Sequence, residues 1–174
     1  MAAMISHRSS IGHWRPMRLA DLPAVGALAA MIHPDYPEDD AVFAERLRLY
    51  PAGCHVLARG DGIAAYVVSH PWHGAPPALN TRLGALPAQP STFYIHDLAL
   101  APDARGTGAA SEIVSWLIAH AREIGAPGLS LIAVNGSAAF WRRHGFAARR
   151  DPGLDRKLDS YGAGAQVMVR TIAG

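Results

Sequence analysis

The sequence is poor in cysteine, in long apolar runs and in charge of one sign. Its single cysteine, Cys54, excludes a disulfide within the chain, and disulfides are rare in the cytoplasm. No apolar stretch approaches the roughly 20 residues of a transmembrane helix, and residues 1–13 lack the apolar run of a signal peptide. We therefore expect a cytoplasmic protein that does not bind membranes, with residues 1–13 forming a flexible N-terminal arm.

Charged residues are scarce and nearly balanced in sign. The chain has 16 Lys+Arg and 14 Asp+Glu, a formal net charge of +2, and only 17% of its residues are charged. A nucleic-acid-binding protein usually carries a strongly basic face, so we expect no nucleic-acid partner. Hydrophobic residues make up 50% of the 174 residues. This composition and length predict one folded domain, from residue 14 to residue 174.

The apolar periodicity predicts a mixed α/β (α+β) chain. A strand over 14–19 is followed by two helices, over 22–32 and from about residue 41 to residue 50. Glycine at positions 60 and 62 then marks the turn of a hairpin, and a loop rich in Pro, Gly and Ala fills 70–91. We then expect a strand over 92–100 and a long helix over 105–124. A strand over 129–134, a short helix over 137–144 and a final hairpin of 146–149 with 166–172 complete the chain. This order predicts a mixed sheet of about six to seven strands with helices on both faces.

A strand-to-helix turn with two glycines is the most informative segment. Gly106 and Gly108 lack the Cβ atoms that would keep an anion away from the main-chain amides, and Arg105 adds a cation beside them. The first turn of a helix also has free N–H groups and a dipole that favours negative charge. The turn therefore predicts a phosphate site, although a helix start that binds nothing fits the same residues. A dinucleotide-binding redox protein fits less well, because Ser111 replaces the third glycine of that motif.

Two segments resemble the signatures of the GNAT superfamily of N-acetyltransferases. Arg105, Gly108 and Ala110 match its acyl-CoA signature Gln/Arg-x-x-Gly-x-Gly/Ala, and residues 135–146 are similar to a second signature that ends in Gly-Phe. The resemblance extends over residues 14–172 and implies the GNAT acyl-CoA N-acyltransferase fold. It also implies an enzyme that transfers an acetyl group from acetyl-CoA to a primary amine of a small molecule, peptide or protein, and that can form a homodimer.

The same resemblance implies how the cosubstrate binds. Main-chain amides at the start of the long helix are expected to hold the CoA pyrophosphate, and the strand before them is expected to pair with the pantetheine arm. The residues implied in cosubstrate binding are Leu98, Ala99, Leu100, Arg105, Gly106, Thr107, Gly108, Ala109, Ala110, Ser111, Asn135, Phe140 and Trp141.

Trp141 departs from the family pattern. Many family members have a tyrosine here, whose phenol protonates the departing CoA thiolate, and an indole N–H cannot supply a proton near neutral pH. A free thiol has a pKa of about 8.5, so water can protonate the thiolate instead. The departure favours an alternative function, a catalytically weak CoA-binding sensor or regulatory module.

His96 and Asp97 are the candidates for the catalytic base that takes up the proton of the amine. Asp97 is favoured by its position on the central strand, and His96 because imidazole titrates near neutral pH. Since side chains alternate along a strand, we expect only one of the two to face the pocket. Either residue could instead be a polar group that stabilises the sheet.

Tyr36 and Trp72 are the candidates for contacts with the acceptor amine. The acidic stretch 35–40 precedes a helix, where carboxylates either stabilise the helix N-terminus or attract a cationic amine, and helix capping is the favoured interpretation. His70 and His73 lie close together in the sequence, but no third ligand accompanies them, so we expect no metal site.

Overall fold

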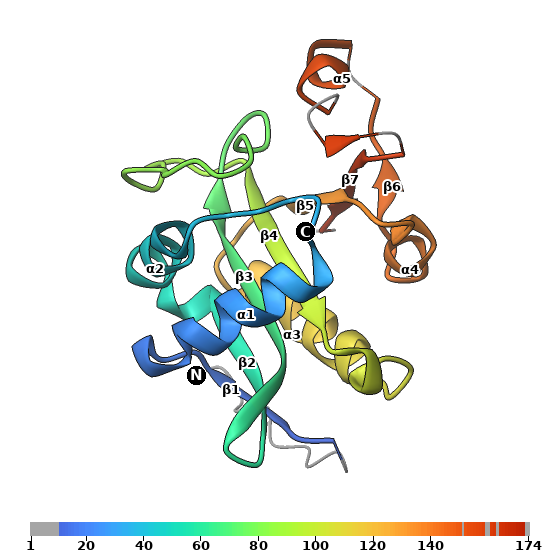
Figure 1. The fold of residues 1–174 in the computed structure, drawn as a ribbon. Helices are drawn as coiled ribbons and strands as arrows, with labels where there is room; N and C mark the ends of the chain where they lie inside the picture. Colours follow the sequence, from blue (N-terminus) through green and yellow to red (C-terminus); the bar gives the residue numbers. More distant parts are fainter. Residues whose placement is uncertain (1–10, 151, 159–160, 163, 173–174) are drawn as a thin grey trace.

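The computed structural model describes residues 11–150, 152–158, 161–162 and 164–172, without the side chains of 155–157. Its strands form one mixed sheet in the order β1-β2-β3-β4-β5-β7-β6, with helices on both faces (Figure 1). The strands are β1 His13–Pro16, β2 Cys54–Arg59, β3 Gly62–Trp72, β4 Thr92–Leu100, β5 Gly128–Ala133, β6 Ala147–Ala148 and β7 Gln166–Thr171. The α-helices are α1 Leu22–Ile32, α2 Asp40–Leu49, α3 Ala109–Glu123, α4 Ala138–Arg143 and α5 Pro152–Leu158.

The predicted mixed sheet is thus confirmed, and two apolar cores lie on its opposite faces. On one face α3 packs a stripe that includes Ile113 and Leu117, both fully buried. On the other face α1 and α2 contribute Val25 and Phe43, and both helices lie in front of the sheet in Figure 1. Burial of each such side chain contributes about 1.5–3 kcal/mol. The helical apolar stripes therefore explain why the sheet is covered on both sides.

Several element boundaries differ from the prediction for local reasons. The helix α3 begins at Ala109 instead of residue 105, because Gly106 and Gly108 have φ angles of +72° and +88°, which an α-helix cannot include. The strand β3 continues to Trp72, so the following loop is shorter than predicted. Helix α5 was not predicted. Residues 1–10 of the predicted arm lie outside the described residues, and His13 already belongs to β1.

Two irregularities of β4 shape the centre of the sheet. The parallel pairing of β4 with β5 ends at Ile95 and Leu131, although β4 continues to Leu100. The two strands therefore separate beyond this point. Against β3, the register shifts so that Ile95 pairs with Ser69 but Asp97 pairs with Val68. The residue between them, His96, is thus the extra residue of a β-bulge.

Candidate active site

A pocket of about 650 Å³ lies where β4 and β5 separate. Residues of β4, the tip of α3, α4 and the segment between α1 and α2 line it. All the cosubstrate residues expected from the sequence line this pocket except Thr107 and Ala109. The Thr107 hydroxyl donates to the main-chain oxygen of Ala104 at 2.7 Å, and Ala109 is buried against the indole of Trp14, whose N–H donates to the Ala109 main-chain oxygen. These two residues can contribute only their main-chain amides.

The N-terminal tip of α3 forms one end of the pocket and has no side-chain cap. The main-chain N–H groups in the first turn of a helix have no acceptor within the helix. Those of Ala110 and Ser111 can therefore bind an anion, whereas the Ala109 N–H donates to the Thr107 hydroxyl at 3.4 Å. A Cβ atom built on Gly106 or Gly108 would meet no other atom within 4 Å, so the space beside these amides is open. Arg105 and Arg143 line the same pocket. Amides, helix dipole and guanidinium groups together fit the diphosphate of a nucleotide cosubstrate.

The bulge in β4 brings His96 and Asp97 to the same face of the sheet. Before the bulge, Ile95 packs in the core beside α3, and after it Leu98 packs against that same core. The alternation of side chains is therefore reversed at His96. Both His96 and Asp97 turn toward α1 and α2, and both line the pocket. The prediction that only one of them faces the pocket is wrong, because it assumed an uninterrupted strand.

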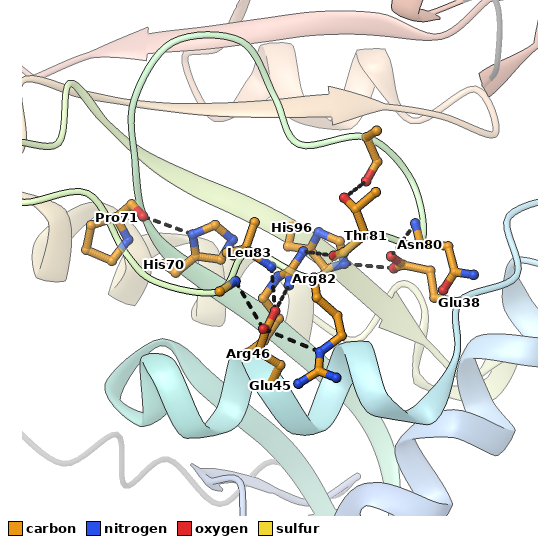
Figure 2. Close-up of polar contacts among 12 residues, drawn as sticks. Glu38, Glu45, Arg46, His70, Pro71, Asn80, Thr81, Arg82, Leu83 and His96 are labelled. Carbon is orange, nitrogen blue, oxygen red and sulfur yellow. Dashed lines mark hydrogen bonds and ion pairs between the residues drawn. The ribbon is translucent and has the colours of Figure 1, made fainter.

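Glu38, in the segment between α1 and α2, binds His96 (Figure 2). Its Oε1 lies 2.7 Å from His96 Nε2, and each side chain is only 6% exposed. Because a carboxylate only accepts, Nε2 carries the donated hydrogen, which leaves Nδ1 with the lone pair when the ring is neutral. Glu38 also accepts from the main-chain N–H of Asn80. Glu38 therefore binds His96 and Asn80 instead of capping α2, and the Asp39 side chain does not cap this helix either.

Asp97 is held between two further side chains. Its Oδ2 accepts a hydrogen bond from the Tyr66 hydroxyl, and its Oδ1 lies 3.0 Å from His33 Nε2. Burial lowers the pKa of His33, but Asp97 and the charge of Glu38 raise it by more, so that the pKa lies above its ordinary value. Burial and the neighbouring carboxylate of Asp97 hold the pKa of Tyr66 well above its ordinary value. Tyr66 therefore remains a protonated donor to Asp97.

His33 also connects the two separated strands. Its Nδ1 lies 3.1 Å from Asn135 Nδ2, in the turn after β5, while its Nε2 faces Asp97 on β4. Neither His33 nor Tyr66 is among the candidates from the sequence, because His33 directly follows the predicted helix over 22–32 and Tyr66 follows the predicted hairpin turn, and neither position carries a motif. No motif in the sequence indicates that these residues lie beside Asp97.

Of the two predicted acceptor residues, the structure brings only Tyr36 to the pocket. Trp72 is not among the lining residues, since β3 extends as far as this residue and its indole N–H donates to the main-chain oxygen of Ala75 at 3.0 Å. Tyr94 and Tyr161 line the pocket in addition to Tyr36. The end of the pocket around Glu38 is therefore rich in phenol side chains.

Cys54 and His70 are buried and do not line the pocket, although the His70 ring lies beside Tyr94 and His96. Burial raises the pKa of the Cys54 thiol to about 12 and lowers the pKa of His70 to about 3. In the part of the chain that the structure describes, no group of three or more His, Cys, Asp or Glu side chains is placed to hold a metal ion. Within the same residues, no helix combines the length and apolarity that crossing a bilayer requires.

Comparisons with known proteins give the same fold. No curated protein sequence matches the chain, but several solved structures do. The GphF GNAT-like decarboxylase, in complex with isobutyryl-CoA, matches with a TM-score of 0.74 and 18% identity over 95% of this chain and 99% of that chain. Ard1 from Thermoplasma volcanium matches with a TM-score of 0.69 and 15% identity over 92% and 97%. The ribosomal-protein-S18-alanine N-acetyltransferase from Escherichia coli matches with a TM-score of 0.62 and 18% identity over 92% and 95%.

At such identities these structures show the fold alone, whereas a match to a family model shows the family. The model of the Acetyltransferase (GNAT) family matches residues 19–146. This match covers well over half of the 174 residues, and it includes the α3 tip and the β4 bulge that form the pocket. The chain therefore belongs to the GNAT acetyltransferase family.

Proposed function

We propose that this protein transfers the acetyl group of acetyl-CoA directly to a primary amine, without a covalent intermediate on the enzyme. The observation that carries the proposal is a single pocket with an uncapped, glycine-opened helix tip in its lining and the Glu38–His96 pair beside the bulge in β4. Membership of the acetyltransferase family supports acyl transfer from a CoA thioester. The related GphF structure contains an acyl-CoA.

The α3 tip is the proposed site of the CoA diphosphate. The main-chain N–H groups from Gly106 to Ser111 would bind its oxygens, with Arg105 and Arg143 as neighbouring cations. The free edge of β4 from Leu98 to Leu100 would pair with the amides of the pantetheine arm, as an added strand does. Asn135, Phe140 and Trp141 line the same pocket. Bound in this way, acetyl-CoA supplies a thioester whose carbonyl carbon an amine can attack.

His96 is the proposed base. Its Nδ1 would take up the proton of the amine, while Glu38 fixes the ring through Nε2 and balances the positive charge that the ring gains. The oxygens of Asp97 already face Tyr66 and His33, so Asp97 is proposed to position His33. A main-chain N–H between Leu98 and Leu100 would donate to the carbonyl oxygen of the thioester. No protein acid is required for the thiolate, because a thiol pKa of about 8.5 allows water to protonate it.

The rival function, a CoA-binding sensor without useful turnover, is favoured by Trp141, which cannot act as the acid that a tyrosine supplies. Either function suits the cytoplasm, because the free thiol of Cys54 is the only cysteine of the chain. The homodimer implied by the family resemblance is tested by the mass of the protein in solution.

The proposed function is tested with acetyl-CoA and a panel of primary amines, read by release of the CoA thiol. We expect an amine-dependent rate, together with binding of CoA in a calorimetric titration. Binding of CoA without turnover of any amine would favour the sensor. Binding of NAD(P) without binding of CoA would contradict both functions.

A further inference from the structure

The loop between β3 and β4 is attached to α2 by a buried ion pair (Figure 2). Arg46 is fully buried and donates from Nη1 to Glu45 Oε1 at 2.9 Å, and from Nη2 to the main-chain oxygen of Thr81 at 2.9 Å. Glu45, also buried, accepts from the main-chain N–H groups of Leu83 and Gly84 at 2.6 and 3.1 Å. Burial of two charges costs several kcal/mol per ion unless other hydrogen bonds replace those with water. The loop supplies those bonds, so displacing it would leave both charges poorly satisfied.

The same loop is bonded to the proposed catalytic pair. The main-chain N–H of Asn80 donates to Glu38 Oε2 at 3.1 Å, while Glu38 Oε1 binds His96. The side-chain oxygen of Asn80 accepts from the main-chain N–H of Asp39 at 2.8 Å. The neighbouring residue Leu79 lines the pocket. The loop therefore borders the pocket on the side of Glu38.

A second set of contacts joins this loop and the segment before α2 to a distant part of the chain. Tyr36 and Tyr161 stack with ring centroids 5.9 Å apart and an angle of 28° between the rings. The Tyr36 hydroxyl donates to the main-chain oxygen of Tyr161 at 2.6 Å, and the Tyr161 hydroxyl lies 3.4 Å from the main-chain oxygen of Pro77, to which it donates. Tyr36, Leu79 and Tyr161 all line the pocket. Segments before α2, within the β3–β4 loop and before β7 thus meet around one end of the pocket.

We propose that this wall, formed by Tyr36, Leu79 and Tyr161, restricts the acceptor to a small-molecule amine that fits wholly inside the pocket and excludes the amino groups of polypeptides. The inference rests on the proposed function. The volume of about 650 Å³ lies within the range of about 300–1,000 Å³ that is usual for small-molecule sites, and the thioester arm occupies part of it. Tyr36 is bonded to Tyr161, and Tyr161 to the loop that carries Leu79, so a polypeptide bound at this end would have to displace these contacts. The buried Glu45–Arg46 pair holds the loop that carries Leu79 in place.

The test compares acceptors that carry the same amine on bodies of different size. Free lysine, cadaverine and amino-acid amides are assayed with acetyl-CoA beside ten-residue peptides with the same residue at the N-terminus or as an internal lysine. We expect kcat/KM for the best small amine to exceed that of every peptide by at least about a hundredfold. Peptides that react as well as small amines would overturn this inference and leave the proposed function intact. If neither group reacts although CoA binds, the proposed function fails, and this inference fails with it.

Variants of the wall provide a second, independent readout. Tyr161→Ala removes one stacked ring, and we expect it to raise kcat/KM for peptides relative to small amines by about tenfold or more, with unchanged affinity for CoA. Tyr161→Phe is the matched control, since it keeps the ring and loses only the hydroxyl contact with Pro77. Glu45→Gln loosens the loop from a different element and should shift selectivity in the same direction. An unchanged ratio in both Tyr161→Ala and Glu45→Gln, with folding intact, would contradict the proposed wall.

Discussion

Replacing Gly108 by alanine separates the cost of a strained turn from the loss of an anion site. Gly108 has a φ angle of +88°, a left-handed conformation that costs a residue with a Cβ atom about 1–2 kcal/mol. An added Cβ atom meets no atom within 4 Å, so no steric clash increases this cost. We expect the free energy of unfolding to fall by about 1–2 kcal/mol and no more. The new methyl group would stand in the pocket, beside the amides of the α3 tip.

The same substitution should weaken CoA binding, because the main-chain N–H groups of the α3 tip must lie close to the phosphate oxygens. An N–H group must approach a phosphate oxygen to about 2.7–3.2 Å, and a methyl group beside it prevents this. Loss of one hydrogen bond to a charged group costs about 1.5–3 kcal/mol, which corresponds to a loss of affinity of about 10- to 150-fold. Isothermal titration with CoA measures the affinity, and urea unfolding measures the stability of the same sample.

Gly60→Ala is the matched control for Gly108→Ala. Gly60, in the turn between β2 and β3, has a φ angle of +59° and also has no atom within 4 Å of an added Cβ. It is absent from the pocket lining. Both variants should therefore lose a similar amount of stability, while only Gly108→Ala should lose affinity for CoA. If both variants bind CoA as the parent does, the assignment of the anion site to the α3 tip is refuted.

Three further perturbations test other parts of the account. Glu38→Gln keeps the shape of the contact with His96 but removes its charge, and we expect kcat to fall about tenfold; Asp35→Asn, at an exposed position, is the control, and equal rates in the two variants would contradict the role of Glu38. Burial lowers the pKa of His70 to about 3, so below pH 6.5 the unfolded state binds the extra proton and stability falls by about 1.4 kcal/mol per pH unit. His70→Gln should therefore reduce the loss of unfolding free energy between pH 6.5 and pH 5 by about 2 kcal/mol, measured by urea unfolding at each pH, and an identical loss in both proteins would contradict this burial effect. Trp141→Phe should leave kcat within about threefold, because an indole N–H does not supply a proton; a loss of more than about a hundredfold would assign Trp141 a direct part in the chemistry.

The sequence predicts the elements whose signals are local. The strand over 92–100 and the glycine turn before α3 are both predicted from signals within a few residues, and residues of both line the pocket. The exact start of α3 was missed, because the positive φ angles of Gly106 and Gly108 depend on the turn that the chain makes there. Helical periodicity alone does not show where such a turn ends.

Features that depend on distant residues could not be predicted in this way. The bulge at His96 is a shift in register against β3, and the sequence of β4 alone does not contain it. Glu38 and His96 are 58 positions apart, so their pairing depends on the packing of α1 and α2 against the sheet. Glu45 and Arg46 are of residue types that are almost always exposed, yet both are buried because the β3–β4 loop covers them. From the sequence of α2 alone, both charged residues would be predicted to be exposed to solvent.

The central claim is that the tip of α3 binds the diphosphate of CoA and directs its thioester along β4. A crystal structure of the protein with CoA bound tests this claim most directly. We expect diphosphate oxygens within about 2.7–3.2 Å of main-chain N–H groups between Gly106 and Ser111, with the thiol end beside the β4 bulge. A diphosphate bound elsewhere, with these N–H groups left free, would contradict it.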